Sequence, residues 1–264
     1  MKHTHLFFLG SGAADWRHEL QPKRAFASLM VDGRILIDCT MAALRRLQEF
    51  RIEPGQISDV LITHGHSDHF SAEAILALAA ASRTDGALLR VHLDRRLAGQ
   101  LPSAKMTVVP LEAGVPVAVA RYQVTPLAAN HPPEVSGEQP LHYLFSQAGR
   151  CFYYATDGAW MTPGTWRTLL GCRLDAWIVD ATIGDGHRGD IRIFEHNSLE
   201  MVRIMTRTLR QQKVLKPHAP VILTHLARTL HPEPIQLAAK LRPPFVAAYD
   251  GYTYEIGEGA SPSA

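Results

Sequence analysis

The sequence has few cysteines, little net charge and no long apolar run, and each shortage excludes a class of protein. The three cysteines, Cys39, Cys151 and Cys172, show no Cys-x-x-Cys spacing, which argues against a disulfide framework and a zinc ribbon. The net charge is only +2, and no basic stripe indicates a nucleic-acid polymer as partner. No stretch approaches the roughly 20 apolar residues of a membrane span, and the apolar run near the N-terminus is too short for a signal peptide. We therefore expect a cytoplasmic protein that does not enter a membrane.

What the chain has instead is the composition of a globular protein. Of its 264 residues, 46% are apolar and 20% are charged, which supports a sizeable core. Strand-like and helix-like patterns alternate along the chain, and this indicates sheets covered by helices on their outer faces. No repeat or low-complexity linker appears before the last residues. We expect one domain over residues 1–257 and a frayed tail over residues 258–264.

Several segments carry clear secondary-structure signals. Asp32-Gly33 separates two strand-like runs and predicts a two-residue hairpin turn, because both positions tolerate positive φ. Leu44 and Leu47 recur at helical spacing, and Pro54-Gly55 would end that helix. The expected helices cover Met41–Phe50, Ala72–Ala81 and Ser198–Leu209, and the expected strands include His5–Leu9, Val60–Ile62, Cys151–Ala155, Ala176–Asp180 and Pro220–Leu223.

The densest group of chemically reactive side chains directly follows one of these strands. The run His64-Gly65-His66-Ser67-Asp68-His69 places three imidazoles and a carboxylate within six residues. Gly65 supplies the conformational freedom for a sharp turn that would bring these side chains together. Neutral imidazole and carboxylate suit zinc, manganese or iron in a site that also keeps water. The alternative is a solvated loop with unrelated histidines, and the restrictive pattern makes it the weaker interpretation.

Three later segments each place a polar residue where an apolar strand ends. They are Asn130-His131, Thr156-Asp157 and Thr224-His225. Taken alone, a histidine in such a place is more often a packed or surface residue than a ligand. Because the first cluster cannot fill two coordination spheres by itself, His131, Asp157 and His225 become candidate ligands for two cations.

The order of these residues resembles the metal motifs of the metallo-β-lactamase superfamily. The resemblance implies an α/β fold, an αββα sandwich of two mixed sheets flanked by helices, with the site at one edge between the sheets. It also implies two divalent cations, zinc or manganese, with iron as a further candidate. Asp38, which ends Ile35-Leu36-Ile37-Asp38, is similar to the family's first motif, a carboxylate behind the metals. The implied assignment is that His64, His66 and His131 hold one metal, that Asp68, His69 and His225 hold the other, and that Asp157 bridges them.

Features outside the ligands resemble the superfamily's phosphodiesterase branch. Residues 8–14, Phe-Leu-Gly-Ser-Gly-Ala-Ala, are similar to the glycine-rich start of that branch. Residues 195–200 and 249–256 resemble the phosphoribosyl 1,2-cyclic phosphate phosphodiesterases of the carbon-phosphorus lyase pathway. Those enzymes carry an extra structural zinc held by closely spaced cysteines near the N-terminus and by a histidine after the last metal-binding one. Here residues 9–21 contain no cysteine and Arg228 stands three residues after His225, so we expect that zinc to be absent.

The resemblance predicts hydrolysis of a small, cyclic phosphodiester. Two neighbouring cations can turn a bridging water into the attacking hydroxide and neutralise charge on a phosphoryl oxygen. His196, outside the ligand set, is the expected general acid for the leaving group, because the ordinary pKa of histidine is near neutrality. We further expect Asp68 to take part in catalysis and Asp180 to hydrogen-bond a metal ligand. His187 and Arg188, in a glycine-rich loop, are expected to contact the anionic substrate.

Other functions remain open alternatives. A lactonase or thioesterase could use the same metals, since one fold hosts several chemistries. Processing of RNA ends is a variant of the first hypothesis, but such enzymes usually need an added basic arm, and none is visible. A redox carrier would replace histidine ligands by acidic ones, and His66 argues against that. The metal's identity and the presence of a homodimer stay open.

Overall fold

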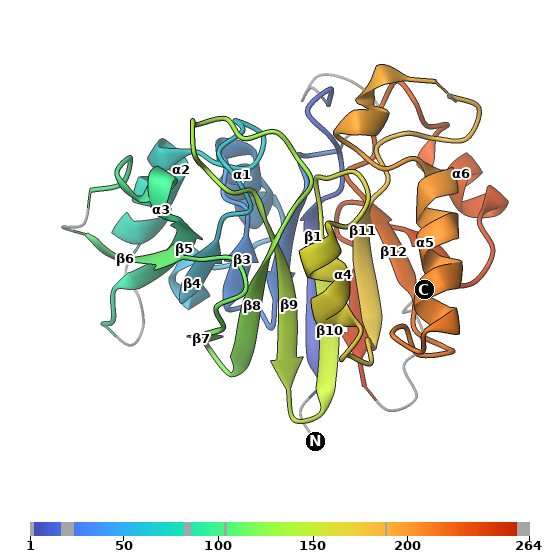
Figure 1. Cartoon of the computed structure of the whole chain (residues 1–264). Coiled ribbons are helices and arrows are strands. Elements are labelled where there is room, and N and C mark those ends of the chain that lie inside the picture. Colours follow the sequence, from blue (N-terminus) through green and yellow to red (C-terminus); the bar gives the residue numbers. More distant parts are fainter. Residues whose placement is uncertain (1–2, 17–23, 82–85, 103–104, 188, 258–264) are drawn as a thin grey trace.

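The fold is a sandwich of two seven-stranded sheets with helices on both outer faces (Figure 1). The computed structural model describes residues 3–16, 24–81, 86–102, 105–187 and 189–257. This architecture confirms the predicted αββα arrangement. The tail expected over residues 258–264 and the predicted substrate contact Arg188 lie outside the described residues.

The first sheet is mixed, with an antiparallel half and a parallel half. Strands β14, β1, β2 and β3 pair antiparallel, and β3, β4, β5 and β6 pair parallel. In sheet order, the strands are β14 (Thr253–Ile256), β1 (Thr4–Gly10), β2 (Ser28–Val31), β3 (Ile35–Ile37), β4 (Asp59–Leu61), β5 (Leu89–Asp94) and β6 (Met106–Leu111).

The second sheet has the same division. Strands β7, β8, β9 and β10 pair antiparallel, and β10, β11, β12 and β13 pair parallel. In sheet order, the strands are β13 (Phe245–Ala247), β12 (Val221–Thr224), β11 (Ala176–Asp180), β10 (Arg150–Ala155), β9 (Leu141–Gln147), β8 (Tyr122–Ala128) and β7 (Val117–Val119).

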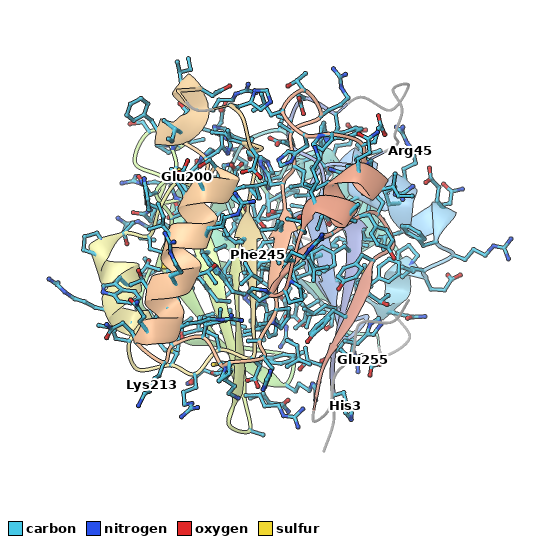
Figure 2. All side chains as sticks on the ribbon, turned by 90° about the vertical axis from the view of Figure 1, so that its right-hand side faces the viewer. His3, Arg45, Glu200, Lys213, Phe245 and Glu255 are labelled. Atoms are coloured by element: carbon cyan, nitrogen blue, oxygen red, sulfur yellow. The ribbon has the colours of Figure 1, made fainter. Side chains whose placement is uncertain are left out.

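Three helices pack against each sheet through apolar side chains. The first sheet is covered by α1 (Met41–Glu49), α2 (Ala72–Ala80) and α3 (Arg95–Ala98), and the second by α4 (Pro163–Leu169), α5 (Leu199–Gln211) and α6 (Pro234–Lys240). Short 3₁₀ turns span Pro54–Gln56 (η1) and Ile191–Phe194 (η2). Figure 2 shows α5 along the outer surface, with Glu200 and Lys213 near its two ends. Within the described residues, no helix has the length and apolar character to cross a bilayer.

Local sequence signals account for the helix and hairpin boundaries. Thr40 caps α1 by accepting from the amide of Ala43, and Ser198 caps α5 by accepting from the amide of Met201. The predicted hairpin between β2 and β3 is present, and Asp32 and Gly33 both have positive φ, 54° and 66°. The connection has three residues rather than two, because Val31 pairs with Ile35 and Arg34 also lies in the turn. These caps and this turn fix the chain directions of the elements that lead to the site.

A core of interleaved aromatic and aliphatic side chains holds the two sheets together. Tyr143, Phe145 and Phe152 are among its buried members, and the rings of Phe145 and Phe152 stack with centroids 4.5 Å apart. Separate apolar layers lie between each sheet and its helices. The sandwich therefore forms a rigid support for the loops at its edges.

One edge of the sandwich collects the ends of the parallel strands. Asp38 follows β3, His64 follows β4, Asp157 follows β10 and His225 follows β12. Because the carboxyl ends of parallel strands meet at the same edge of a sheet, the loops after these strands face a common space. The fold thus brings together residues that are far apart in the sequence.

Candidate metal centre

The predicted ligands form two clusters that share one aspartate. In each cluster the potential ligand atoms lie within 4.8 Å of one another. The first cluster contains His64, His66, His131 and Asp157, and the second contains Asp68, His69, Asp157 and His225. The structure therefore brings all the predicted ligands together, in the two groups that the family resemblance implied.

Asp157 lies between the two clusters. Its Oδ2 is 3.4 Å from Nε2 of His64, 3.0 Å from Nε2 of His69 and 3.5 Å from Nε2 of His225. The residue has a positive φ of 69°, a conformation that aspartate tolerates better than most side chains. Its place matches that of a carboxylate shared by two cations.

Hydrogen bonds to one nitrogen of an imidazole determine what the other nitrogen presents. Nδ1 of His69 lies 2.7 Å from Oδ2 of Asp38, an acceptor, and so must donate. Nδ1 of His225 lies 2.8 Å from the hydroxyl of Thr182, whose own proton serves the His225 carbonyl or Asp180. The two Nε2 atoms face each other at 3.3 Å. Burial opposes the charged form of His69, but Asp68, Asp38 and Asp157 outweigh it and raise the pKa of His69 well above its ordinary value. Without a cation its Nε2 therefore carries a proton, which a bound cation would displace.

The first cluster shows the same convergence. Nδ1 of His66 lies 2.9 Å from Nε2 of His64 and 3.1 Å from Nε2 of His131. Nδ1 of His131 donates to the carbonyl of Glu195, so Nε2 of His131 remains to bind a cation. Oδ1 of Asp157 is buried and lies 2.7 Å from Nδ1 of His196. This set of imidazole and carboxylate donors fits divalent cations such as zinc and manganese.

Burial and neighbouring charges keep two of the candidate ligands, His64 and Asp157, in the protonation states that bind metal. Burial, together with His69, lowers the pKa of His64 to about 3, so its imidazole is neutral. Burial opposes ionisation of Asp157, but His225 and the other nearby histidines outweigh it and hold its pKa well below the ordinary value. Neutral imidazole and ionised carboxylate are the forms that coordinate cations.

His196 lies next to the shared aspartate. Its Nδ1 is 3.0 Å from Oδ2 of Asp180 and 2.7 Å from Oδ1 of Asp157. Burial opposes its charged form, but these two carboxylates outweigh burial and raise the pKa of His196 to about 11. Asp180 is itself fixed by the amides of Thr182 and Asn197. The structure therefore places Asp180 beside both His196 and the metal centre.

The role predicted for Gly65 is wrong in its physical reason. Gly65 is not among the glycines with positive φ, so the turn does not depend on its conformational freedom. What it provides is space, because a Cβ there would lie 2.9 Å from Cδ2 of Leu97 and 3.2 Å from Oε2 of Glu138. The buried Glu138 accepts from the Gly65 amide at 2.7 Å and so anchors the histidine run.

Supporting residues were missed by sequence reasoning because they are common types without a motif. Thr63 donates to Asp38 and contacts Nδ1 of His64, and Thr182 contacts Nδ1 of His225. Glu138 comes from a loop with no pattern of its own. The only available signal was adjacency: Thr63 precedes His64, and Thr182 stands two residues after Asp180.

The loop after β1 is tied to the segment that follows His225. Asp15 accepts from the amides of Arg228 and Thr229, at 2.9 and 3.0 Å. The indole of Trp16 donates to the carbonyl of Leu226 at 2.6 Å. The loop after β1 thus makes direct contact with the segment that follows the candidate metal ligand His225.

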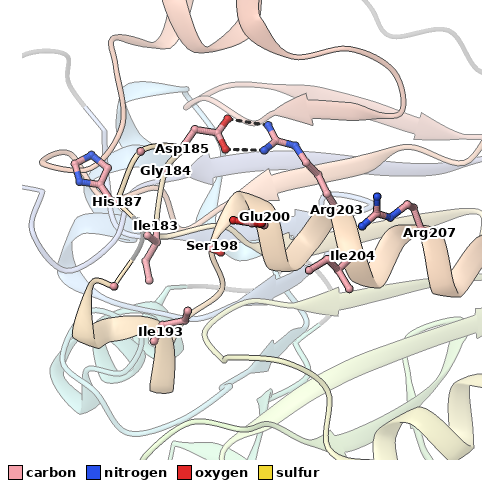
Figure 3. A pocket seen from close by; sticks show the side chains of 12 residues that line it. Ile183, Gly184, Asp185, His187, Ile193, Ser198, Glu200, Arg203, Ile204 and Arg207 are labelled. Atoms are coloured by element: carbon pink, nitrogen blue, oxygen red, sulfur yellow. Dashed lines mark hydrogen bonds and ion pairs between the residues drawn. The ribbon is translucent and has the colours of Figure 1, made fainter.

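His187 lies in a different environment from the two clusters. It is exposed and lines a cavity of about 850 Å³ between the loop after β11 and helix α5 (Figure 3). On the wall of this cavity, Asp185 and Arg203 form a bidentate ion pair with distances of 2.6 and 2.8 Å. A substrate contact by His187 stays a prediction.

Two layered sheets with a histidine and aspartate cluster at their shared edge define a metal-dependent hydrolase of the αββα type. The chain belongs to the β-lactamase superfamily, since the family model for the β-lactamase superfamily domain matches residues 33–225. It is 25% identical to the ribonuclease Z of Pyrobaculum calidifontis, over 90% of this chain and 93% of that protein.

Solved structures share the fold at lower identity. A diphosphatase of the PhnP family superposes with a TM-score of 0.72 and 19% identity, covering 96% of this chain and 97% of the other. Zinc-bound PqqB from Methylobacterium extorquens superposes with a TM-score of 0.72 and 15% identity, covering 94% and 99%. These structures support the αββα fold over nearly the whole chain.

Proposed function

We propose that this chain is a dinuclear metal-dependent phosphodiesterase that hydrolyses a small, cyclic phosphodiester. His64, His66 and His131 would hold one divalent cation, Asp68, His69 and His225 the other, and Asp157 both. When bound, such cations supply a nucleophile from water at neutral pH and neutralise charge on a phosphoryl oxygen.

The observation that carries the proposal is the pair formed by His196 and Asp180. Asp180 engages Nδ1 of His196, while Nε2 forms no hydrogen bond with the described residues. The ring stacks on that of His225 with centroids 5.3 Å apart, so His196 borders the metal centre. A protonated imidazole held in this way can give its Nε2 proton to a departing alkoxide.

Comparisons add support without deciding the substrate. The similar proteins include a ribonuclease and a diphosphatase, both named for chemistry at phosphorus. A lactonase or thioesterase remains the alternative, because an acyl substrate could occupy the same space. RNA is a further candidate substrate, since the curated relative is named ribonuclease Z.

A substrate panel tests the proposal. The metal-loaded protein is assayed with bis(p-nitrophenyl) phosphate, a 2′,3′-cyclic nucleotide, an acyl lactone and a precursor RNA with a 3′ extension. We expect the two small phosphodiesters to be cleaved. Turnover of the lactone alone would overturn the proposal, and turnover of the RNA alone would move it to polymer substrates.

The general acid is tested by its dependence on the leaving group. With the cyclic nucleotide, whose alkoxide needs a proton, His196→Ala should lower kcat by roughly 10² to 10⁴-fold. With p-nitrophenolate, which leaves without protonation, the same variant should lose far less. The exposed His218 makes a matched control, and His218→Ala should change neither rate. Equal losses with both substrates would show that His196 is not the acid.

A further inference from the structure

A second cavity lies beside the metal centre and does not belong to it. It has a volume of about 290 Å³ and is lined by Trp16, by residues 24–26, by one side of α1 and by Asp250. Trp16 forms part of its wall, and its indole donates to the carbonyl of Leu226, the residue after His225. None of the candidate metal ligands lines this cavity.

Arg24 lies in the wall of this cavity as a buried cation. It is 5% exposed, and its Nε and Nη2 atoms are buried with no hydrogen-bond partner among the described residues. Burial lowers its pKa, while Asp250 and Glu233 act on it only through space. The oxygens of Asp250 are already used by the backbone amides of Ser11 and Ala25. A buried guanidinium without an acceptor is costly, so its retention calls for an acceptor that is not among the described residues.

The same cavity offers an apolar surface next to this cation. The guanidinium carbon of Arg24 lies 5.3 Å from the centroid of the Trp16 ring. Gly12 makes room for that ring, because a Cβ on Gly12 would lie 2.2 Å from Cδ1 of Trp16. Met41, at the first turn of α1, is 45% exposed and also lines the cavity. A flat or compact apolar group could lie against these side chains.

The charges around the cavity favour an anion. Arg46 is occupied by Glu49 and by Asp250, whose nearest oxygen is 3.3 Å away. Arg45 is exposed and forms no hydrogen bond or ion pair with any described residue; Figure 2 shows it at the surface of the molecule. Among the described residues, this leaves Arg24 inside and Arg45 at the rim as two cations without an ion-paired carboxylate.

We propose that this cavity is a binding site for a small anion with an apolar body, whose carboxylate or phosphate pairs with Arg24 and whose body lies against Trp16 and Met41. The volume suits a ligand of about the size of a substituted benzene ring. The site stands apart from the metal centre, so its ligand is neither a metal nor the reacting group. The proposal does not depend on the phosphodiesterase activity, and either can fail without the other.

Benzoate and phenyl phosphate serve as probes with the metal-loaded protein, and they separate the carboxylate and phosphate versions of the ligand. Binding is measured by calorimetry and by the rise in Tm. We expect saturable binding of at least one probe, and Arg24→Met should weaken it at least tenfold. Without probe, Arg24→Met should leave the Tm equal or higher, because it removes an unpaired buried cation. Arg34→Met, at an exposed arginine of the hairpin turn, is the control and should change nothing.

Phenyl phosphate can also reach the metal centre, so the criterion is the part of the binding that Arg24→Met removes. Binding that is unchanged in this variant, or no saturable binding of either probe, overturns the proposal. If Arg24→Met does not fold, probe binding is measured with Met41→Glu instead. This exposed change places an anion at the mouth of the cavity, and it should weaken binding at least tenfold; unchanged binding would count against the site.

Discussion

Oδ2 of Asp38 accepts a hydrogen bond from Nδ1 of His69 at 2.7 Å, and both side chains are almost fully buried. Asp38 also accepts from the amide of Thr63, so its position is fixed. The bond keeps a proton on Nδ1 of His69 and so makes Nε2, which faces the metal centre, the atom that would bind a cation. Asp38 thus sets the form in which His69 can bind a cation.

This relationship predicts the effect of Asp38→Asn. An amide has a single acceptor oxygen, so asparagine cannot accept from both Thr63 and His69 as the two oxygens of Asp38 do, and His69 loses the partner that selects its tautomer. We expect metal affinity to fall about 10- to 100-fold, measured by competition with a chelator of known affinity. Asp175→Asn, at a carboxylate that pairs with Lys216 away from the site, is the control and should keep wild-type affinity. Unchanged affinity in Asp38→Asn would mean that His69 needs no such partner.

Gly65→Ala tests whether space, rather than backbone freedom, is what that position requires. The new Cβ would press on Leu97 and Glu138, and overpacking of this kind costs about 1–3 kcal/mol. The histidine run would shift with it, so metal content should fall as well. Gly99→Ala is the matched control, since a Cβ there meets nothing within 4 Å. Urea unfolding measures stability; equal stability of the two variants would contradict the packing argument.

The sequence predicted the site better than it predicted the elements that cover it. His64, Asp157 and His225 follow short apolar strands, and such strands are visible as patterns in the chain. Helices α3, α4 and α6 were not predicted, because they have four to seven residues and their apolar faces are set by packing against the sheets. Hydrogen bonds from Thr63 and Thr182 could not be predicted, because they depend on which loops meet at the edge.

Asp250 gives the folded protein a specific pH dependence. Burial raises its pKa to about 6, although the amide of Ala25 and the guanidinium of Arg46 work in the opposite direction. In the unfolded chain the pKa of an aspartate is about 3.9, so between pH 4 and 6 the folded state binds more protons than the unfolded state. The contribution of Asp250 to stability therefore declines as the pH rises through that window. The difference in the free energy of unfolding between Asp250→Asn and the wild type should therefore shift in favour of the variant, by up to about 3 kcal/mol from pH 4 to pH 7. Urea unfolding at several pH values measures this difference; a constant difference would mean that Asp250 titrates normally.

Removing the metals should destabilise the fold at the edge where the strands end. Without cations, the Nε2 atoms of His69 and His225, which face each other at 3.3 Å, and the buried carboxylates of Asp68 and Asp157 lose the ion that would join them. Cations at a thousand times their Kd would add about 4 kcal/mol of stability, so dialysis against a chelator should lower the Tm by several degrees and zinc or manganese should restore it. His225→Ala removes one of the facing nitrogens, and its Tm should respond less to the chelator. His218→Ala, at an exposed histidine, should respond as the wild type does. A Tm that is the same with and without the chelator in the wild type would contradict a metal centre at this edge.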